Sequence, residues 1–500
     1  MRVGRNLAAG IASSVWTALV GLAVIPVYVR HLGHEGYGLV ALLTTAQAVF
    51  QALDLGLSTS INREIARETE SGDLSDAPGL LRTVAAIYWT MALVIALSML
   101  VFSHFMAAHW LSVQGLPIED VEYAVALIGL VIACRWPGQL YQGALMGAQR
   151  IVVSSALSAG LVTLGSLGAA VVIALVSPSV SAFMLWQAGA GLVYTLAARA
   201  ASWRVVGRGR ARTDRAHLAR IWRFSAGVTA ITVTGIVLSQ LDKIVLSKML
   251  SLAEYGQYMV AFALAGTLYL FTLPLFNAVY PRFSGLVQSG DVDSLERTYR
   301  LATRLLATIV FPLAMLLAVF PAELIQAWTG DGELAANAAL LLPILAVGTA
   351  LHAVMYVPYA LQLAYGTTRL QLTISALLLA FATPATIVLV LRFGAVGGAL
   401  AWLSLHSLYL VLGTWLTHRR LLKGLGPEWM TREVGVPFAV SALVGVLAHI
   451  VSTDGALSLY ARVACGAGWA LAAFALAFVA SPGLRGAALD RLRGMTYRIP

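Results

Sequence analysis

The tetrapeptide Gly36-Tyr37-Gly38-Leu39 has a counterpart 218 residues later, Glu254-Tyr255-Gly256-Gln257, and this repeat decides how the chain is expected to fold. Further matches keep the same offset: Ser71-Gly72-Asp73 with Ser289-Gly290-Asp291, and Leu81-Arg82 with Tyr299-Arg300. The second half of the chain therefore repeats the architecture of the first. A membrane protein made of two similar bundles has a natural cleft between them, and many transporters alternate access by rocking one bundle against the other. The repeat favours a carrier over an enzyme.

Composition places the chain in a membrane. Of its 500 residues, 59% are hydrophobic and only 11% are charged, whereas a soluble globular chain carries about 25% charged residues. Apolar runs of roughly 20 residues recur throughout, and each is long enough to cross a hydrocarbon core of about 30 Å. Because the runs are continuous rather than alternating, they indicate helices and exclude an outer-membrane barrel. The sequence predicts an all-α integral membrane protein.

The apolar runs define the predicted domains. We predict about 14 spans, at 8–29, 38–60, 83–105, 121–144, 151–176, 180–199, 225–249, 256–279, 301–320, 336–361, 370–391, 395–416, 435–452 and 457–480. Arg2 and Arg5 precede a long first span without a small-residue cleavage site, so this span is expected to remain as a helix. The prediction is two pseudo-symmetric six-helix lobes around a central cavity, followed by two extra helices. The first lobe is 1–199 and the second lobe is 225–416, with a basic cytoplasmic linker at 200–224 between them. The C-terminal pair of helices and its cytoplasmic tail are 417–500.

Basic residues predict the orientation. Most of the 33 Lys and Arg residues fall on one side when the N-terminus is placed inside, and an even number of spans then puts both ends in the cytoplasm. The densest cluster is in and beside the linker: Arg199, Arg204, Arg208, Arg210, Arg212, Arg215, Arg220 and Arg223. Leu218, Ile221 and Trp222 share one face there, which is typical of a short helix lying on the inner leaflet. The net charge of +10 therefore reports topology rather than nucleic-acid binding.

Several chemistries have no support in the sequence. Cys134 and Cys465 both fall within predicted spans, so disulfide and metal sites are not expected. No phosphate-binding loop, zinc-protease, dinucleotide or serine-nucleophile motif occurs. The segments between spans are shorter than the roughly 50 residues that a domain needs. We expect a transporter without a cofactor, driven by an ion gradient, the membrane potential, a partner or the substrate's own gradient.

Polar residues recur at helical spacing within four predicted spans. Within hydrocarbon such a face must point at protein or water. The stripes are Thr44, Gln47, Gln51, Asp54, Ser58 and Asn62; Arg135, Gln139, Gln142 and Gln149; Thr229, Thr232, Ser239, Gln240, Lys243 and Ser247; and Thr349, His352, Tyr356 and Tyr359. Interhelical hydrogen bonds explain many such residues, but the long stripe carrying Asp54 favours a water-filled cavity.

Arg135 is the strongest single candidate for a functional residue. It lies mid-span, where an arginine costs about 2.5–3.5 kcal/mol on insertion scales. Its planar fork suits phosphate, so it is expected either to contact an anion in a cavity or to pair with a carboxylate such as Asp54 or Asp242. Asp242 and Lys243 are adjacent on a helix and point about 100° apart, so we expect them to face different partners, with the lysine snorkelling outward. His352 is a candidate proton carrier, although a buried histidine satisfied by its neighbours is commoner.

The chain resembles the Wzx-type oligosaccharide-lipid flippases, polysaccharide transporters of the multidrug/oligosaccharidyl-lipid/polysaccharide superfamily. The segments that carry the resemblance are Pro26-Val-Tyr-Val-Arg-His-Leu-Gly-His-Glu-Gly-Tyr-Gly-Leu39, Leu53-Asp-Leu-Gly-Leu57, Gln142-Gly-Ala-Leu-Met-Gly-Ala-Gln-Arg150, Leu241-Asp-Lys-Ile-Val245 and Glu254-Tyr-Gly-Gln-Tyr258. The resemblance implies a cargo of undecaprenyl-diphosphate-linked oligosaccharide, moved from the inner to the outer leaflet of the bacterial cytoplasmic membrane. Polysaccharide-assembly proteins are a further expected class of partner.

The resemblance also implies roles for the polar residues. Related flippases use cationic cavity residues for the diphosphate; here Arg135 is the deep cation, with Lys243 and Arg30 as shallower candidates. The expected substrate-binding set is Arg135, Gln139, Gln142, Gln47, Gln51, Lys243, Gln240, Tyr356 and Tyr359, with Tyr258 and Tyr269 as further aromatics that stack on sugars. The expected ion-coupling candidates are Asp54, Asp242 and His352.

Three alternatives stay open at this point. A drug or metabolite cation antiporter of the same superfamily usually has 12 spans, and the two helices after residue 435 argue against it. A membrane-embedded polysaccharide polymerase or glycosyltransferase usually needs a large outer loop, whereas Glu323, Asp331 and Glu333 lie in a loop of about 15 residues. A non-transporting scaffold would tolerate the loss of Arg135. The sugar, the coupling ion and the oligomeric state are not encoded in any motif of the chain.

Overall fold

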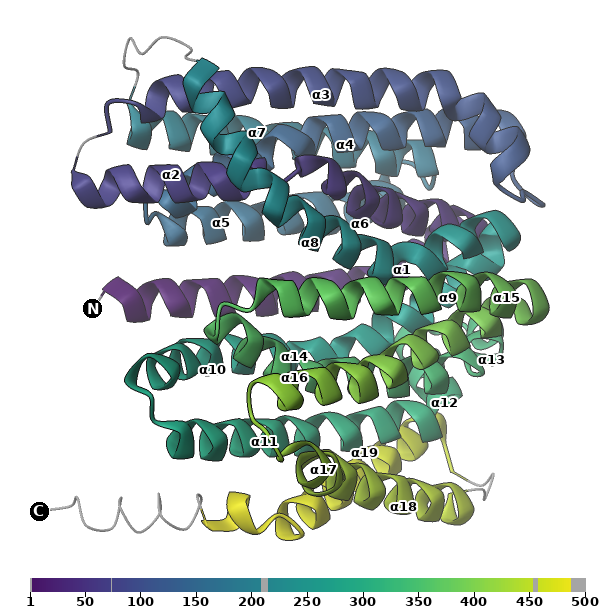
Figure 1. Cartoon of the computed structure of the whole chain (residues 1–500). Helices are drawn as coiled ribbons and strands as arrows, with labels where there is room; N and C mark the ends of the chain where they lie inside the picture. The colour runs from purple at the N-terminus through teal and green to yellow at the C-terminus, as the bar shows by residue number, and fades with distance from the viewer. Residues whose placement is uncertain (1, 73, 208–214, 453–456, 487–500) are drawn as a thin grey trace, which may run out of the picture. The chain divides into compact units, whose positions relative to one another are not determined.

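The computed structural model describes residues 2–72, 74–207, 215–452 and 457–486, and the side chains of these residues except 2–8, 215–228, 230 and 231. Helices account for nearly all of this part of the chain (Figure 1). An isolated bridge between Ser112 and Ser251 is the one extended pairing among the described residues. The predicted all-α class is confirmed. The chain forms two compact units, Met1–Gly256 and Gln257–Pro500.

The first unit is built around α4. Its elements are α1 (Arg2–Gln51), η1 (Ala52–Asp54), α2 (Leu57–Ser71), α3 (Ala77–Phe105), η2 (Met106–Trp110), α4 (Ile118–Gly147), α5 (Ile151–Val162), η3 (Thr163–Leu167), α6 (Gly168–Leu175), α7 (Val180–Val206), α8 (Arg215–Met249) and the first turn of α9 (Leu252–Ala265). Helix α4 packs lengthwise against α3 and α7 and also contacts α2. Small residues permit this close packing: a Cβ added to Gly143 would lie 2.6 Å from the Ser58 carbonyl oxygen.

The second unit is built around α11 and α14. Its elements after α9 are η4 (Gly266–Leu268), α10 (Tyr269–Ser289), α11 (Val292–Val319), α12 (Pro321–Thr329), α13 (Gly332–Ala338), α14 (Leu341–Ala364), α15 (Thr368–Leu408), η5 (Tyr409–Gly413), α16 (Thr414–Arg420), α17 (Gly426–Glu428), η6 (Trp429–Gly435), α18 (Val436–Val451) and α19 (Leu459–Val479). Helices α18 and α19, the predicted C-terminal pair, pack on α11 through Met315, Val444 and Ala473.

Ten helical segments among the described residues are long and apolar enough to cross a membrane, so the predicted count of 14 is not confirmed. The two longest of the ten are too long for one crossing. Ala9–Asp54 has 46 residues, about 69 Å at 1.5 Å per residue, more than twice the hydrocarbon thickness. It bends at Gly33 (φ 71°), and Thr368–Arg420 bends at Gly394 (φ 56°). Each of these segments therefore contains two of the predicted spans, and the predicted spans 121–144 and 225–249 lie on α4 and α8.

The sequence repeat has a structural counterpart. Gly72 (φ 76°) and Gly290 (φ 72°) end α2 and α10 in the same left-handed conformation, which glycine adopts without steric cost. The other pair of repeated glycines meets directly, because a Cβ on Gly256 would lie 3.2 Å from the Gly38 nitrogen and 2.8 Å from the His34 carbonyl oxygen. The two Tyr-Gly motifs therefore contact each other within the first unit.

Several segments predicted to connect spans are helical. Helix α2 covers much of 62–82 and α10 extends through Ser289. Asp291 then caps α11, accepting a hydrogen bond from the Ser294 N–H at 3.0 Å, and this bond lowers the pKa of Asp291. Residues 208–214 and the side chains of Leu218, Ile221 and Trp222 lie outside the described residues, and so does the predicted interfacial face of the linker.

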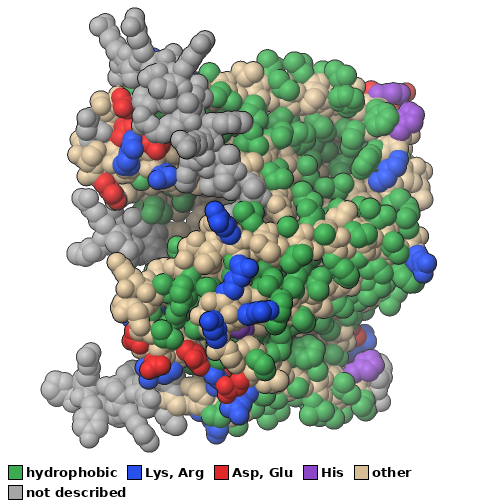
Figure 2. All heavy atoms as spheres, in the orientation of Figure 1, with side chains coloured by type: hydrophobic (Ala, Val, Ile, Leu, Met, Phe, Trp, Pro, Cys, Tyr) green, Lys and Arg blue, Asp and Glu red, His purple; other side chains and the backbone are tan. Residues whose placement is uncertain are grey.

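Exposed apolar side chains cover the transmembrane surfaces. Figure 2 shows hydrophobic side chains spread over the visible faces of the helices. On α3, Leu93, Val94 and Val101 are 59%, 59% and 73% exposed, and on α18 Leu443 and Ile450 are each 63% exposed. Exposure of such apolar surfaces to water costs free energy, whereas lipid chains solvate them. The chain is a multi-pass membrane protein.

Candidate functional site

Arg135 lies inside the first unit, between α4 and α7. Its guanidinium donates a hydrogen bond to the side-chain carbonyl of Gln187 on α7. Its Nε is buried and has no hydrogen-bond partner among the described residues. Nearby, the Tyr28 hydroxyl of α1 donates to the Ser166 carbonyl at 2.7 Å and its ring meets Phe183 edge-on. The arginine is therefore enclosed by α1, α4, α7 and the π-helical turn η3, and its guanidinium Nε makes no hydrogen bond to the described residues.

Two glycines make the space for this guanidinium. A Cβ on Gly191 would lie 2.6 Å from the Arg135 Cγ, closer than real contacts allow. A Cβ on Gly165, in η3, would lie 3.0 Å from the Gln187 carbonyl oxygen and 3.4 Å from the Arg135 Nη2. Single π-turns are frequent at functional sites. The local backbone is therefore shaped around the arginine head.

Neither Asp54 nor Asp242, the two carboxylates predicted as partners, forms an ion pair with Arg135. No ion pair found in the described part of the chain includes Arg135. The expectation of a pair with Asp54 or Asp242 is wrong, because each of those residues is held by other groups. The partner that the structure supplies is the neutral Gln187, which orients the fork without cancelling its charge.

Asp54 lies at a helix break, and the predicted single stripe through 44–62 is wrong. The chain leaves α1 through η1, and then Leu55 (φ 49°) and Gly56 (φ 69°) take the left-handed conformation before α2 begins. Asp54 is 8% exposed; it accepts hydrogen bonds from the Tyr88 hydroxyl on α3 and from the Ser58 hydroxyl at 2.8 Å. A non-glycine residue with positive φ beside a buried carboxylate marks a strained position of the kind that clusters at functional sites.

Asp242 and Lys243 bind each other. The Lys243 ammonium lies 3.0 Å and 3.1 Å from the two Asp242 carboxylate oxygens and 2.9 Å from the Ser239 carbonyl. Lys243 is 2% exposed, so the expectation that it snorkels outward is wrong. The four-carbon stem lets the lysine fold back along its own helix, which a rigid estimate of side-chain direction misses. The paired ammonium and carboxylate together carry little net charge.

The second unit gathers its candidates into one aromatic cluster. The His352 Nδ1 lies 2.6 Å from the Tyr269 hydroxyl, and its ring stands 4.3 Å from that of His406. Phe276 of α10 stacks on Tyr359 and meets Tyr356 edge-on. The predicted residues His352, Tyr356 and Tyr359 are thus brought together, and Tyr269 joins them. Sequence spacing alone missed Phe276.

The remaining predicted residues lie in different environments. Gln142 is a packing residue, since it donates to Ser158 at 3.1 Å and accepts from Tyr194 at 3.1 Å. Gln240 contacts Ser239 at 3.5 Å. The buried Gln47 Nε2 has no partner among the described residues, while Gln51 is exposed and Gln139 half-buried. Gln149 lies beyond the end of α4 with φ 57°, so it does not continue the stripe of Arg135.

Gln187 and the two glycines are the site residues that the sequence did not identify. Gln187 is a buried amide in an otherwise apolar stretch of α7, and that isolation was the available signal. Gly165 and Gly191 had no signal, since their role depends on where Arg135 ends. No group of His, Cys, Asp and Glu side chains suited to a metal occurs among the residues that were described.

Comparisons with known proteins agree with this fold. Residues 3–287 match the family described as "Polysaccharide biosynthesis protein". The chain is 20% identical over 424 residues to the "Putative O-antigen transporter" of Shigella flexneri, covering 82% of this chain and 98% of that protein. It is 24% identical over 449 residues to the "Succinoglycan biosynthesis transport protein ExoT" of Rhizobium meliloti (strain 1021), covering 85% of this chain and 82% of that protein.

Solved structures show the same architecture. The lipid II flippase MurJ in an inward closed conformation superposes with a TM-score of 0.69 at 11% identity, covering 93% of this chain and 98% of that one. An inward-facing multidrug resistance MATE family transporter superposes with a TM-score of 0.66 at 16% identity, covering 81% and 95%. The relatives are named as transporters, which confirms the expectation of a transporter rather than an enzyme. The chain belongs to the polysaccharide biosynthesis protein family.

Proposed function

We propose that this protein is a flippase that moves a lipid-linked oligosaccharide from the inner to the outer leaflet of the bacterial cytoplasmic membrane. The observation that carries the proposal is Arg135, a guanidinium within the first unit whose hydrogen-bond partner is neutral and whose Nε has no partner among the described residues. The names of the relatives, an O-antigen transporter and a succinoglycan transport protein, support this cargo class. The distribution of arginines along the sequence supports a cytoplasmic location for both termini.

The chemistry of the cargo explains why such a residue is useful. A diphosphate with several sugars cannot cross hydrocarbon unaided, because its charges and hydroxyl groups lose their hydrogen bonds to water. A planar guanidinium can bind phosphate oxygens in a bidentate manner and offset the negative charge. In this scheme the lipid tail stays in the bilayer while the head group crosses a wet cavity between the lobes 1–199 and 225–416.

Aromatic residues of the second unit fit the sugar part of the cargo. Tyr356 and Tyr359 are half-buried, with Phe276 packed against both rings. Aromatic faces with a polar tip can stack on sugar rings and accept or donate hydrogen bonds at the same time. We assign Tyr356 and Tyr359 to sugar contact, and Gln47, Gln51, Gln139 and Gln240 to the polar lining.

Coupling to an ion requires a group whose charge differs between two conformations, since only differential affinity shifts a population. Asp54 is the strongest such group, because it lies at the break between α1 and α2 and is bound through two hydroxyls rather than a cation. His352 is a second candidate, held by Tyr269. Asp242 is the weakest, since Lys243 already neutralises it.

Export of polysaccharide by a strain that lacks the chromosomal copy tests the proposal. Arg135→Ala is expected to abolish export and to accumulate the lipid-linked intermediate in the inner leaflet, while Arg135→Lys keeps part of the export. Arg67→Ala, an exposed arginine on α2, is the matched control. Full export by Arg135→Ala, at wild-type protein level, would contradict the proposal.

The drug-antiporter alternative is separated by a second measurement. Vesicles that contain the purified protein are expected to transport ethidium no faster than empty vesicles. Ethidium efflux that depends on Asp54, with no change in polysaccharide export, would favour the antiporter. Single cysteines at Gln51, Arg135 and Gln240 test the cavity itself, since at least one conformation should expose them to an aqueous thiol reagent.

A further inference from the structure

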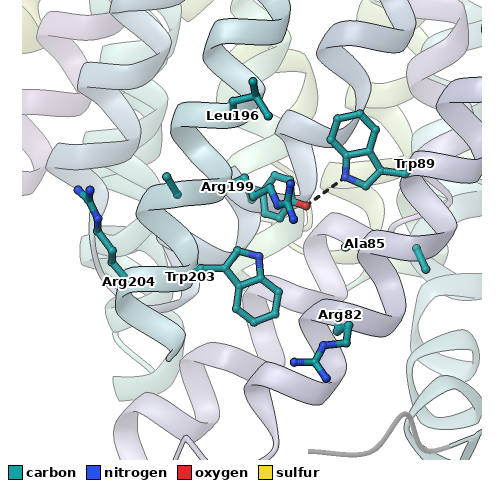
Figure 3. Close-up of a pocket in the computed structure, with 10 residues that line it drawn as sticks. Arg82, Ala85, Trp89, Leu196, Arg199, Trp203 and Arg204 are labelled. Atoms are coloured by element: carbon teal, nitrogen blue, oxygen red, sulfur yellow. Dashed lines mark hydrogen bonds between the residues drawn. The ribbon is translucent and has the colours of Figure 1, made fainter. Parts of the chain in front are cut away.

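A second polar site lies in the first unit, apart from Arg135, between the ends of α3 and α7 (Figure 3). It is a pocket of about 980 Å³. Its cationic wall consists of Arg82 from α3 and Arg199 and Arg204 from α7, and its aromatic wall of Trp89 and Trp203. Tyr141 of α4 lines the interior, where its hydroxyl accepts a hydrogen bond from the Trp89 indole at 3.2 Å.

The three arginines have no anionic partner in the described part of the chain. All three are exposed, and none takes part in an ion pair there. Like charges placed around one pocket repel one another, which costs free energy unless an anion is bound among them. The pocket therefore has the electrostatics of an anion site.

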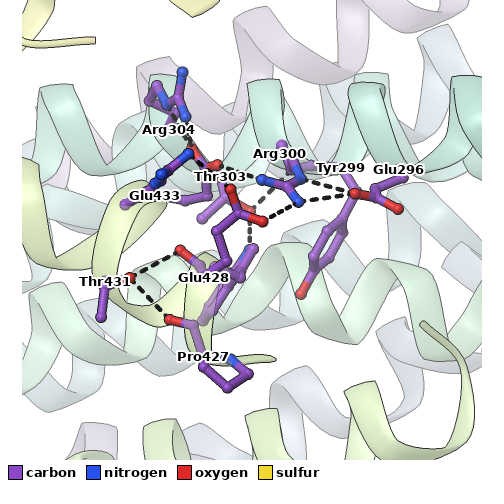
Figure 4. A network of polar contacts seen from close by, with 11 residues as sticks. Glu296, Tyr299, Arg300, Thr303, Arg304, Pro427, Glu428, Thr431 and Glu433 are labelled. Atoms are coloured by element: carbon purple, nitrogen blue, oxygen red, sulfur yellow. Dashed lines mark hydrogen bonds and ion pairs between the residues drawn. The ribbon is translucent and has the colours of Figure 1, made fainter. Parts of the chain in front are cut away.

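The second repeat shows what the same face of the helix binds when the chain supplies the ligand (Figure 4). At the offset of 218 residues, Arg82 corresponds to Arg300 on α11. Arg300 lies 2.9 Å from Glu296, 2.7 Å from Glu428 and 3.5 Å from Glu433. These last two carboxylates come from α17 and η6, which cover this face of α11. In the second unit the arginine at this position is thus bound by carboxylates.

Neighbouring positions follow the same contrast. Ala85 and Ala86 in the pocket correspond to Thr303 and Arg304, which bind the Trp429 indole at 3.0 Å and the Glu433 carboxylate at 2.5 Å. The first repeat has small side chains there, so space remains open.

The surroundings indicate which anion fits. Both walls belong to helices with lipid-facing apolar surfaces, for example Leu93 (59% exposed) on α3 and Val193 (56% exposed) on α7. Tryptophans concentrate at the level of lipid head groups, and basic residues at helix ends attract anionic lipids of the cytoplasmic leaflet. The fork of an arginine matches a phosphate oxygen pair. We propose that this pocket binds the phosphate head group of an anionic membrane lipid.

The proposal goes beyond transport of the cargo and does not require it. A lipid bound here would bridge α3 and α7 of one unit, in the way that Glu428 and Glu433 tie η6 and α17 to α11 in the other. The phosphate of the bound lipid would then take the place that the Glu428 and Glu433 carboxylates occupy in the second repeat.

Lipid binding to the purified full-length protein in detergent tests the proposal by native mass spectrometry. The wild type is expected to retain phosphatidylglycerol in preference to phosphatidylcholine. The variant R82Q/R199Q/R204Q should lose roughly a hundredfold in affinity, since each basic residue near the head group contributes about fivefold. The variant R82K/R199K/R204K should keep part of it. The control R67Q/R282Q/R297Q removes the same charge from exposed positions outside the pocket and should bind as the wild type does.

A second pair of variants leaves every arginine in place. Ala86 is exposed and corresponds to Arg304, so Ala86→Glu puts a carboxylate among the three arginines. Ala86→Glu should weaken phosphatidylglycerol binding, whereas Ala86→Gln, of nearly the same size, should not. Soluble inorganic phosphate and glycerol phosphate are added as competitors to identify the source of the phosphate.

Several results would overturn the proposal. One is equal phosphatidylglycerol binding by R82Q/R199Q/R204Q and by the control triple, with both proteins monodisperse. Another is soluble phosphate that binds as tightly as the lipid, which would make the ligand a free phosphate. Binding lost equally in Ala86→Glu and Ala86→Gln would mean that bulk, not charge, is responsible. None of these measurements uses transport, so failure here is distinguishable from failure of the flippase proposal.

Discussion

Arg300 and Arg82 hold equivalent positions in the two repeats, yet Arg300 is bound by Glu296, Glu428 and Glu433 whereas no ion pair in the described part of the chain includes Arg82. In the second repeat two of the three glutamates come from α17 and η6, which bring them to α11. The two equivalent positions therefore differ: Arg300 lies in a network of ion pairs, and Arg82 lines a basic pocket.

Glu433 should be the most sensitive carboxylate of this network. It is fully buried and lies 2.5 Å from Arg304, which is 15% exposed. Removing one partner of a buried pair leaves an uncompensated charge and costs about 3–5 kcal/mol. We expect Glu433→Ala to lower the midpoint of thermal unfolding in detergent strongly. Glu296→Ala is the control: Glu296 is 39% exposed, so the loss should be about 0–1 kcal/mol. Equal shifts for the two variants would show that burial does not set the strength of this network.

Gly191→Ala should impair transport through Arg135. The added Cβ would lie 2.6 Å from the Arg135 Cγ, so the guanidinium must move away from Gln187. Overpacking of this kind costs about 1–3 kcal/mol. Gly189→Ala, on the same helix, meets nothing within 4 Å and should export polysaccharide as the wild type does. The same export in both variants would mean that the position of the Arg135 head does not matter for transport.

The sequence predicted the all-α membrane class, because this class depends on local apolar runs that can be read directly. It did not predict the break after Asp54, since Leu55 has no propensity for a left-handed backbone and packing imposes it. Nor did it predict the Gln187 partner of Arg135, which is 52 residues away and requires the packing of α4 on α7. The Asp242–Lys243 pair was missed for a different reason: backbone geometry directs the two Cβ atoms apart, but the flexible lysine stem reverses that direction.

Asp54→Asn should lower transport more than Ser58→Ala. Asp54 binds both Tyr88 and Ser58, whereas Ser58 loses one hydrogen bond when it is changed. If Asp54 couples an ion, Asp54→Asn should reduce export while the unfolding midpoint stays near that of the wild type. Tyr88→Phe separates the roles, since it leaves the carboxylate in place and removes its donor. Equal, mild losses in Asp54→Asn and Ser58→Ala would return Asp54 to a purely structural role.

Gly256→Ala should disrupt the contact between the two Tyr-Gly motifs of the first unit. Its Cβ would approach the His34 carbonyl oxygen to 2.8 Å and the Gly38 nitrogen to 3.2 Å, and these are backbone atoms that cannot rotate away. Gly38→Ala is more severe, since its Cβ would lie 2.1 Å from the Leu252 carbonyl oxygen. Gly21→Ala on α1 has open space and serves as the control. The yield of monodisperse protein and its unfolding midpoint are the readouts. Both glycines belong to the repeated Tyr-Gly motif. If they contribute to one contact, the double variant should have the same yield and unfolding midpoint as Gly38→Ala alone. Additive losses would show that the two glycines support two separate contacts.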